Sequence, residues 1–228
     1  MKKYQCVATT VSPMTKLFRI EALIDGPWGP AGTQGGWIAS EANLSHAGTC
    51  WVDEEAQVFG DAVVSDHAQI SGAAQVFGTA CVAGQAQISG HAQVFDQALV
   101  FSTTRISGRA KIFDRAHILG DAQIAGHAQI CGRARISGTT RISDFAQVSG
   151  RTYISGAAQI FGRAQIRDSA WVFGAAMVFD DAVVSDEALV FDTAQVFGRA
   201  QIRNTARVYR AAQVCGDAIV FGDVAVFG

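Results

Sequence analysis

The sequence predicts an all-β solenoid, in which short strands coil into a triangular prism. Three observations lead to this prediction. From residue 56 to residue 228 the chain repeats every six residues without an insertion, and the third position of all 29 repeats is Val or Ile. Aromatic residues also recur with a second period of 18 residues. A short, fixed period of this kind is typical of proteins that stack one structural unit on the next.

Each six-residue repeat is expected to form a short strand followed by a corner. The first position is Ala in 25 of 29 repeats, and it lies two residues before the Val or Ile. In an extended chain these two side chains point to the same side, so they fill the interior, where β-branched residues pack well. The fifth position is Gly, Asp or Asn in 27 of 29 repeats. These residue types adopt positive φ most easily, so each repeat ends in a corner.

The second period indicates how many sides the prism has. The fourth position carries one row of residues at a spacing of 18, namely Phe59, Phe77, Phe95 and Phe113. Three six-residue sides per turn would stack such residues at the ~4.8 Å separation of neighbouring strands. Residues 50–228 then form about ten coils and a rod ~48 Å long.

The first 49 residues are expected to form a small N-terminal β cap. Residues 16–24 and 36–44 have the pattern of two strands, separated by a stretch rich in Gly and Pro. A solenoid end exposes unpaired backbone groups and an open core, so a cap is needed there. The side chains expected to close the core are Trp28, Trp37 and Trp51.

The run from Ala56 to His67, AQVFGDAVVSDH, resembles the hexapeptide repeats of left-handed parallel β-helix proteins. The resemblance covers about four fifths of the chain and implies a left-handed coil. Residues 17–24, 35–38 and 43–45 are similar to the N-terminal cap of hexapeptide-repeat proteins from bacterial and prophage genomes. The resemblance implies a homotrimer packed through one face, and it links the chain to acyltransferases of this fold. Many such proteins are called transferases by analogy alone, and a fold does not by itself determine function.

Composition excludes several classes of protein. The formal net charge of −2 argues against a polycation. Apolar runs are too short to span a bilayer, and the N-terminus lacks the apolar region of a secretory signal. The five cysteines show no metal-ligand spacing and fit a reducing compartment. We expect a cytoplasmic protein with no metal site and no membrane contact.

Each outer face of the prism is expected to have its own chemistry. Two faces carry rows of Gln, whose amides can hydrogen-bond from coil to coil. The third face is largely apolar, and such a surface is unfavourable on a soluble monomer. We therefore expect self-association, as a trimer, through this face; the alternative is that its rings only stack on one another along the prism. The expected interface residues are Leu99, Phe101, Tyr153, Trp171, Phe173, Leu189 and Phe191.

Charge is banded along the predicted rod. Residues 105–167 carry ten bases and three acids, whereas residues 53–104 and 168–198 each carry six acids and no base. Within the basic band, Arg115, Arg133 and Arg151 occupy one corner on three successive coils. Like charges ~5 Å apart repel, so an anion or nearby acids must offset them. The nearby acids expected to do so are Asp96, Asp114 and Asp144.

The arginine corner is therefore a candidate anion site for a phosphate, a nucleotide or an acidic polymer. A solvated edge, or a contact with the acidic band of a neighbouring rod, is the alternative. Aromatic residues are sparse in the basic band, which argues against nucleic-acid binding.

Catalysis is not favoured by the sequence. Acyltransferases of this fold use a His near a subunit boundary as general base, and they interrupt the coil with protruding loops. Among the five histidines only His117 lies on the apolar face, so it is the candidate base, with acyl-CoA as the donor, if the chain is an enzyme. The uninterrupted repeat predicts a smooth prism without a concave pocket, except between subunits or beside the cap.

We expect a non-enzymatic, oligomeric β-helical scaffold or binding protein, of the phage-derived type that the resemblance implies. It would present rigid faces to a protein or to an anionic ligand. Two alternatives stay open. One is an acyltransferase-like enzyme with an inter-subunit site, and the other is a binder of phosphorylated small molecules at the arginine corner. A cofactor is expected only for the acyltransferase.

Overall fold

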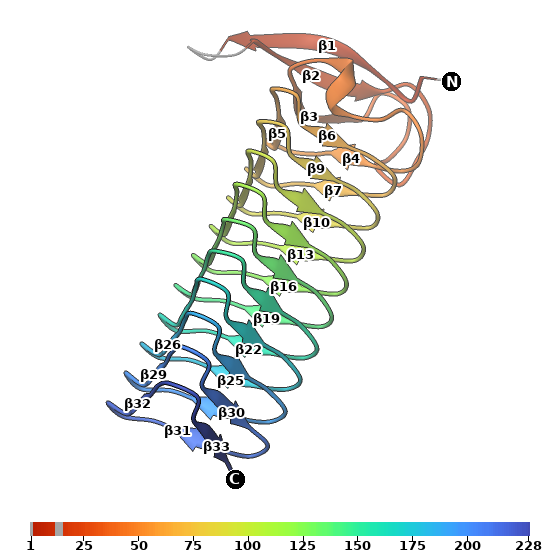
Figure 1. Ribbon diagram of the computed structural model, residues 1–228. Helices are drawn as coiled ribbons and strands as arrows, with labels where there is room; N and C mark the ends of the chain where they lie inside the picture. Colours follow the sequence, from red (N-terminus) through yellow and green to blue (C-terminus); the bar gives the residue numbers. More distant parts are fainter. Residues whose placement is uncertain (1, 12–15) are drawn as a thin grey trace.

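The computed structural model describes residues 2–11 and 16–228; for residues 8–11 only the backbone is described. It confirms the all-β solenoid (Figure 1): β-strands and one short 3-10 helix coil into a rod capped at its N-terminal end. Almost every strand of the rod is two residues long, and the strands form three sheets along its sides. No helix in the described part of the chain is long and apolar enough to cross a membrane.

Sheet 1 contains 13 strands, of which the first three belong to the cap. In spatial order they are β1 (Tyr4–Val11), β2 (Lys16–Ala22), β3 (Gln34–Ile38), β5 (Gln57–Val58), β8 (Gln75–Val76), β11 (Gln93–Val94), β14 (Lys111–Ile112), β17 (Gln129–Ile130), β20 (Gln147–Val148), β23 (Gln165–Ile166), β26 (Val183–Val184), β29 (Gln201–Ile202) and β32 (Ile219–Val220).

Sheets 2 and 3 contain ten strands each. Sheet 2 is the predicted apolar face and consists of β6 (Val63–Val64), β9 (Cys81–Val82), β12 (Leu99–Val100), β15 (His117–Ile118), β18 (Arg135–Ile136), β21 (Tyr153–Ile154), β24 (Trp171–Val172), β27 (Leu189–Val190), β30 (Arg207–Tyr209) and β33 (Ala225–Phe227). Sheet 3 consists of β4 (Trp51–Val52), β7 (Gln69–Ile70), β10 (Gln87–Ile88), β13 (Arg105–Ile106), β16 (Gln123–Ile124), β19 (Arg141–Ile142), β22 (Gln159–Ile160), β25 (Met177–Val178), β28 (Gln195–Val196) and β31 (Gln213–Val214).

The register confirms three repeats per turn. Each strand of the rod pairs in parallel with the strand 18 residues away, so Gln87 lies beside both Gln69 and Arg105. The predicted row of phenylalanines is a stack, with ring centroids of Phe59 and Phe77 4.9 Å apart and their planes parallel. Side chains separated by 18 residues are therefore vertical neighbours on one face.

The core consists of the first and third positions of the repeat. From Ala56 to Val208, every residue at these positions is at most 1% exposed. Burying a Val or Ile side chain contributes about 1.5–3 kcal/mol, which is offset in part by the cost of ordering the chain. The interior is thus a continuous column of small and β-branched side chains.

The corners need positive φ, as the sequence predicts. Even the two corner residues that are not Gly, Asp or Asn adopt positive φ, which is 64° at Ser102 and 58° at Arg210. At Gly138, where φ is 74°, an added Cβ would lie 2.5 Å from the backbone oxygen of Gly156 on the next coil. Glycine is therefore favoured there both by its backbone conformation and by the close approach of the next coil.

The cap extends sheet 1 beyond the last coil. Strands β1, β2 and β3 are antiparallel, and β3 pairs in parallel with β5 of the rod. The expected strand at 36–44 ends earlier than predicted, because η1 (Glu41–Asn43) turns the chain after Ile38, and it begins earlier, at Gln34. Strand β1 is absent from the sequence prediction.

A Gly138→Ala variant is expected to be destabilised by about 2–4 kcal/mol, because it combines a strained φ with a clash against the next coil. The matched control is Gly216→Ala. Gly216 also has positive φ, 66°, but an added Cβ meets nothing within 4 Å, so about 1–2 kcal/mol is expected. Denaturant unfolding followed by circular dichroism measures both. Equal losses of stability in the two variants would show that the close approach of the next coil does not add to the destabilisation by Gly138→Ala.

Candidate functional site

The three corner arginines lie together where the 18-residue period predicts them. Arg115, Arg133 and Arg151 follow β14, β17 and β20, at the corner between sheet 1 and sheet 2, and all three are exposed. Backbone hydrogen bonds hold this column in place: the Arg115 amide donates to the Gly132 carbonyl at 2.8 Å, and the Arg133 amide donates to that of Gly150 at 2.6 Å. The spacing of the Cα atoms in this column is thus set by the backbone.

The acids at this corner bind backbone amides instead of the arginines. The Asp96 carboxylate accepts from the Asp114 amide at 3.3 Å, and the Asp114 carboxylate accepts from the Gly132 amide at 2.9 Å. Such bonds cap the amide of the next corner residue.

The sequence prediction was wrong about Asp144. It ends a repeat of sheet 3, so it lies at the corner between sheets 3 and 1, where it accepts from the Gly162 amide at 3.0 Å. Among the residues that the structure describes, no acid forms an ion pair with Arg115, Arg133 or Arg151. The Arg115 Nε donates to the Gln97 side chain at 2.9 Å.

Two hollows open along the arginine corner, so the expectation of a smooth prism is wrong there. The larger has a volume of about 700 Å³ and is lined by Gly78, Thr79, Asp96, Gln97, Asp114, Arg115, Gly132 and Arg133. The smaller has a volume of about 290 Å³ and is lined by Arg133, Arg135, Arg151, Thr152, Tyr153 and Trp171. Arg133 lines both. Short residues between long arginines leave this space.

The site can hold an anion without further rearrangement of the backbone. Guanidinium groups stay charged at any physiological pH and bind phosphate or carboxylate oxygens in pairs. Their mutual repulsion is relieved by a bound anion. Arg135 was missed in the sequence prediction; its spacing of two residues from Arg133 is the signal that could have revealed it, because it places Arg135 on β18 beside the corner.

The predicted apolar residues all lie on sheet 2, but they do not behave alike. Phe173 and Phe191 are half-buried and stack at 4.9 Å, and Tyr209 continues the stack at 5.0 Å. This fits the alternative in which rings cover one another within the chain. Trp171 is 48% exposed and tilts by 53° against Tyr153. Self-association through this face stays a prediction. The other residues predicted to form the interface, Leu99, Phe101 and Leu189, are half-buried.

His117, the candidate general base, lies on the outer face of sheet 2. It is half-buried on β15, between Leu99 of one neighbouring strand and Arg135 of the other. In the described residues its ring makes no hydrogen bond or ion pair, although a general base is commonly oriented by such a partner. Neither hollow includes it. The described chain also contains no cluster of His, Cys, Asp and Glu suited to a metal.

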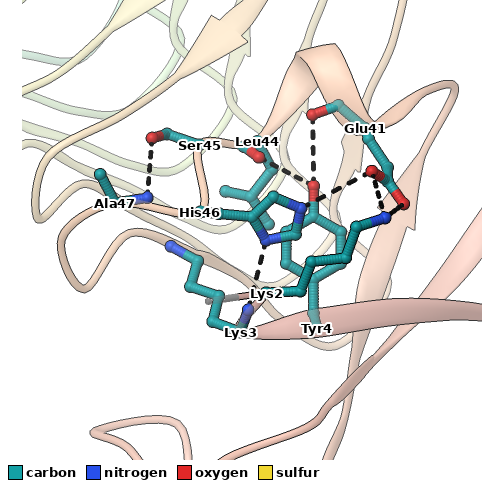
Figure 2. A network of polar contacts seen from close by, with 8 residues as sticks. All are labelled: Lys2, Lys3, Tyr4, Glu41, Leu44, Ser45, His46 and Ala47. Atoms are coloured by element: carbon teal, nitrogen blue, oxygen red, sulfur yellow. Dashed lines mark hydrogen bonds and ion pairs between the residues drawn. The ribbon is translucent and has the colours of Figure 1, made fainter.

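The titratable groups of the cap bind one another and the backbone (Figure 2). The Lys2 ammonium contacts both carboxylate oxygens of Glu41, at 2.7 and 2.8 Å, and holds the pKa of Glu41 below its usual value. The Tyr4 hydroxyl donates to the Leu44 carbonyl at 2.8 Å, and burial raises the pKa of Tyr4 well above its usual value. The His46 ring stacks on Tyr4 at 4.3 Å. These contacts are those of a structural cap.

Two of the three expected tryptophans close the core. Trp51 is 1% exposed, and Trp28 stacks on it with ring centroids 4.8 Å apart. Trp37 instead lies at the edge, where its Nε1 donates to Glu55 at 3.1 Å. Beneath the pair, the Lys3 ammonium donates to the Cys50 carbonyl at 2.8 Å. The stacked pair of tryptophans and the Lys3 contact thus close the N-terminal end of the rod.

Comparison with known proteins agrees with the fold. A family model described as "YdcK Beta solenoid repeat" matches residues 128–144 and 212–227. A stretch of 43 residues is 49% identical to a protein of Escherichia coli (strain K12) named "Uncharacterized acetyltransferase YdcK". This stretch covers 18% of the chain and 13% of that relative. With the coordinates, these likenesses show a hexapeptide-repeat β-helix protein.

Replacing Tyr4 by Phe is expected to lower the free energy of unfolding by about 1 kcal/mol, because the buried Leu44 carbonyl loses its donor. Tyr153→Phe is the control, since the Tyr153 hydroxyl makes no hydrogen bond within the described residues. Thermal unfolding of both variants checks this. A loss of similar size in the control would contradict the role assigned to the Tyr4 hydroxyl.

Proposed function

We propose that this protein is a rigid, non-enzymatic binding rod that holds a polyvalent anion at the corner of Arg115, Arg133 and Arg151. One observation carries the proposal: a hollow of about 700 Å³ is lined by Arg115 and Arg133, while the acids of the same corner, Asp96 and Asp114, accept hydrogen bonds from backbone amides. The guanidinium groups are thus exposed beside a hollow without an ion-pair partner in the described residues.

Phosphate groups are the anions that this corner fits best. The guanidinium groups project from successive coils, ~4.8 Å apart, so a ligand with several phosphates can contact more than one of them. The column is held by the backbone ladder, so little ordering is needed on binding and little affinity is lost to it. An oligophosphate or a phosphorylated small molecule is the expected ligand class.

Acyl transfer is the second candidate, because the relative from Escherichia coli is named as an acetyltransferase. His117 would then be the general base and acyl-CoA the donor. The matched stretch covers 13% of that relative, and the His117 ring has no orienting partner among the described residues, so we place this function second.

Self-association through sheet 2 is part of the proposal. Trp171 is half exposed, and a hollow of about 480 Å³ lies beside it, lined in part by Phe173 and Leu189. A homotrimer with parallel rods would bring the basic bands of neighbouring copies to the same height. An anion bound at the corner would reduce that repulsion, so binding and assembly would support each other.

The anion site is tested with tripolyphosphate in isothermal titration calorimetry at low and moderate salt. The Arg115→Gln, Arg133→Gln double variant is expected to weaken binding at least about tenfold, because charge-assisted hydrogen bonds are lost. The control Arg105→Gln, Arg141→Gln removes the same charge from sheet 3. We expect the control to bind within about threefold of the native protein. Equal weakening in both, or no binding by the native chain, would refute the corner as the site.

Self-association is tested by light scattering on the Phe173→Glu, Leu189→Glu variant. New charge in a desolvated interface is strongly unfavourable, so the assembly is expected to become monomeric. Gln159→Glu with Gln195→Glu on sheet 3 is the matched control and is expected to leave the mass unchanged. Circular dichroism confirms that the coils are intact. A native protein that is already monomeric, or a folded variant with the native mass, would refute self-association through sheet 2.

A further inference from the structure

A hollow of about 290 Å³ lies at the arginine corner. Arg133, Arg135 and Arg151 line it, and all three are exposed. In the part of the chain that the structure describes, none of them forms an ion pair. Three guanidinium groups around a small hollow form a suitable set for phosphate oxygens.

The other wall of this hollow is aromatic. Tyr153 and Trp171 both line it, and their ring centroids are 5.4 Å apart. The phenylalanine columns stack in parallel, but this pair is tilted by 53° and Trp171 remains 48% exposed. An exposed indole beside several arginines is a platform on which a planar ring can stack.

We infer that this hollow binds a nucleotide, with its base on Trp171 and its phosphates on Arg133, Arg135 and Arg151. The inference rests on the proposed anion-binding function and names the ligand class of that corner. Because Arg133 also lines the larger hollow, a longer phosphate tail extends from the smaller hollow toward Arg115. The aromatic wall and the three cations together distinguish a nucleotide from a phosphate alone.

The experiment compares three probes, ADP, pyrophosphate and adenosine, by calorimetry and by quenching of tryptophan fluorescence. ADP is expected to bind about tenfold more tightly than pyrophosphate, because stacking of the base adds to the phosphate contacts. Adenosine is expected to bind far more weakly than either. Trp171→Leu, which introduces the residue found on the next strand, should reduce ADP binding to the pyrophosphate level and leave pyrophosphate binding unchanged.

Unfolding curves of the Trp171→Leu variant verify that the rod is intact.

The outcomes separate the two proposals. If ADP and pyrophosphate bind equally and Trp171→Leu has no effect, the nucleotide inference is wrong while the anion-binding function stands. If none of ADP, pyrophosphate and tripolyphosphate binds, both the nucleotide inference and the proposed anion-binding function are refuted.

Discussion

The structure depends on one interaction, the parallel backbone pairing of residues that are 18 apart. A two-residue strand has no stability of its own, and each is held because the strands above and below bond to it. This pairing converts positions along the chain into columns along the rod. The phenylalanine stack, the buried Val and Ile and the row of arginines are all products of the same register.

Acidic residues at the corners have a structural role in addition to their charge. Asp96 and Asp114 adopt positive φ and accept from the amide of the next coil, so they are part of the backbone ladder. An aspartate there keeps its negative charge, but its carboxylate is engaged in the ladder and, within the described ranges, forms no ion pair with the arginine beside it. The guanidinium groups of this corner consequently have no carboxylate partner in the described residues, although acids lie next to them in the sequence.

Much of the fold could be predicted because the repeat has no insertion. The six- and 18-residue periods determine the strands, the corners, the core and the column of Arg115, Arg133 and Arg151. Strand β1 could not be predicted, because YQCVATTV lacks both the period and a turn signal. The hollows could not be predicted either, since they depend on differences in side-chain length between neighbouring columns.

The three-sided coil also constrains how this gene can change in length. Gain or loss of 18 codons inserts or removes one whole turn, and every downstream residue keeps its side of the prism. A change of six or twelve codons preserves the buried pattern but rotates all later residues to another side, because each side is one repeat long. A chain with such an insertion or deletion would still fold, but every surface column that crosses the change would be interrupted. The surface columns therefore restrict changes in chain length more strictly than the core does.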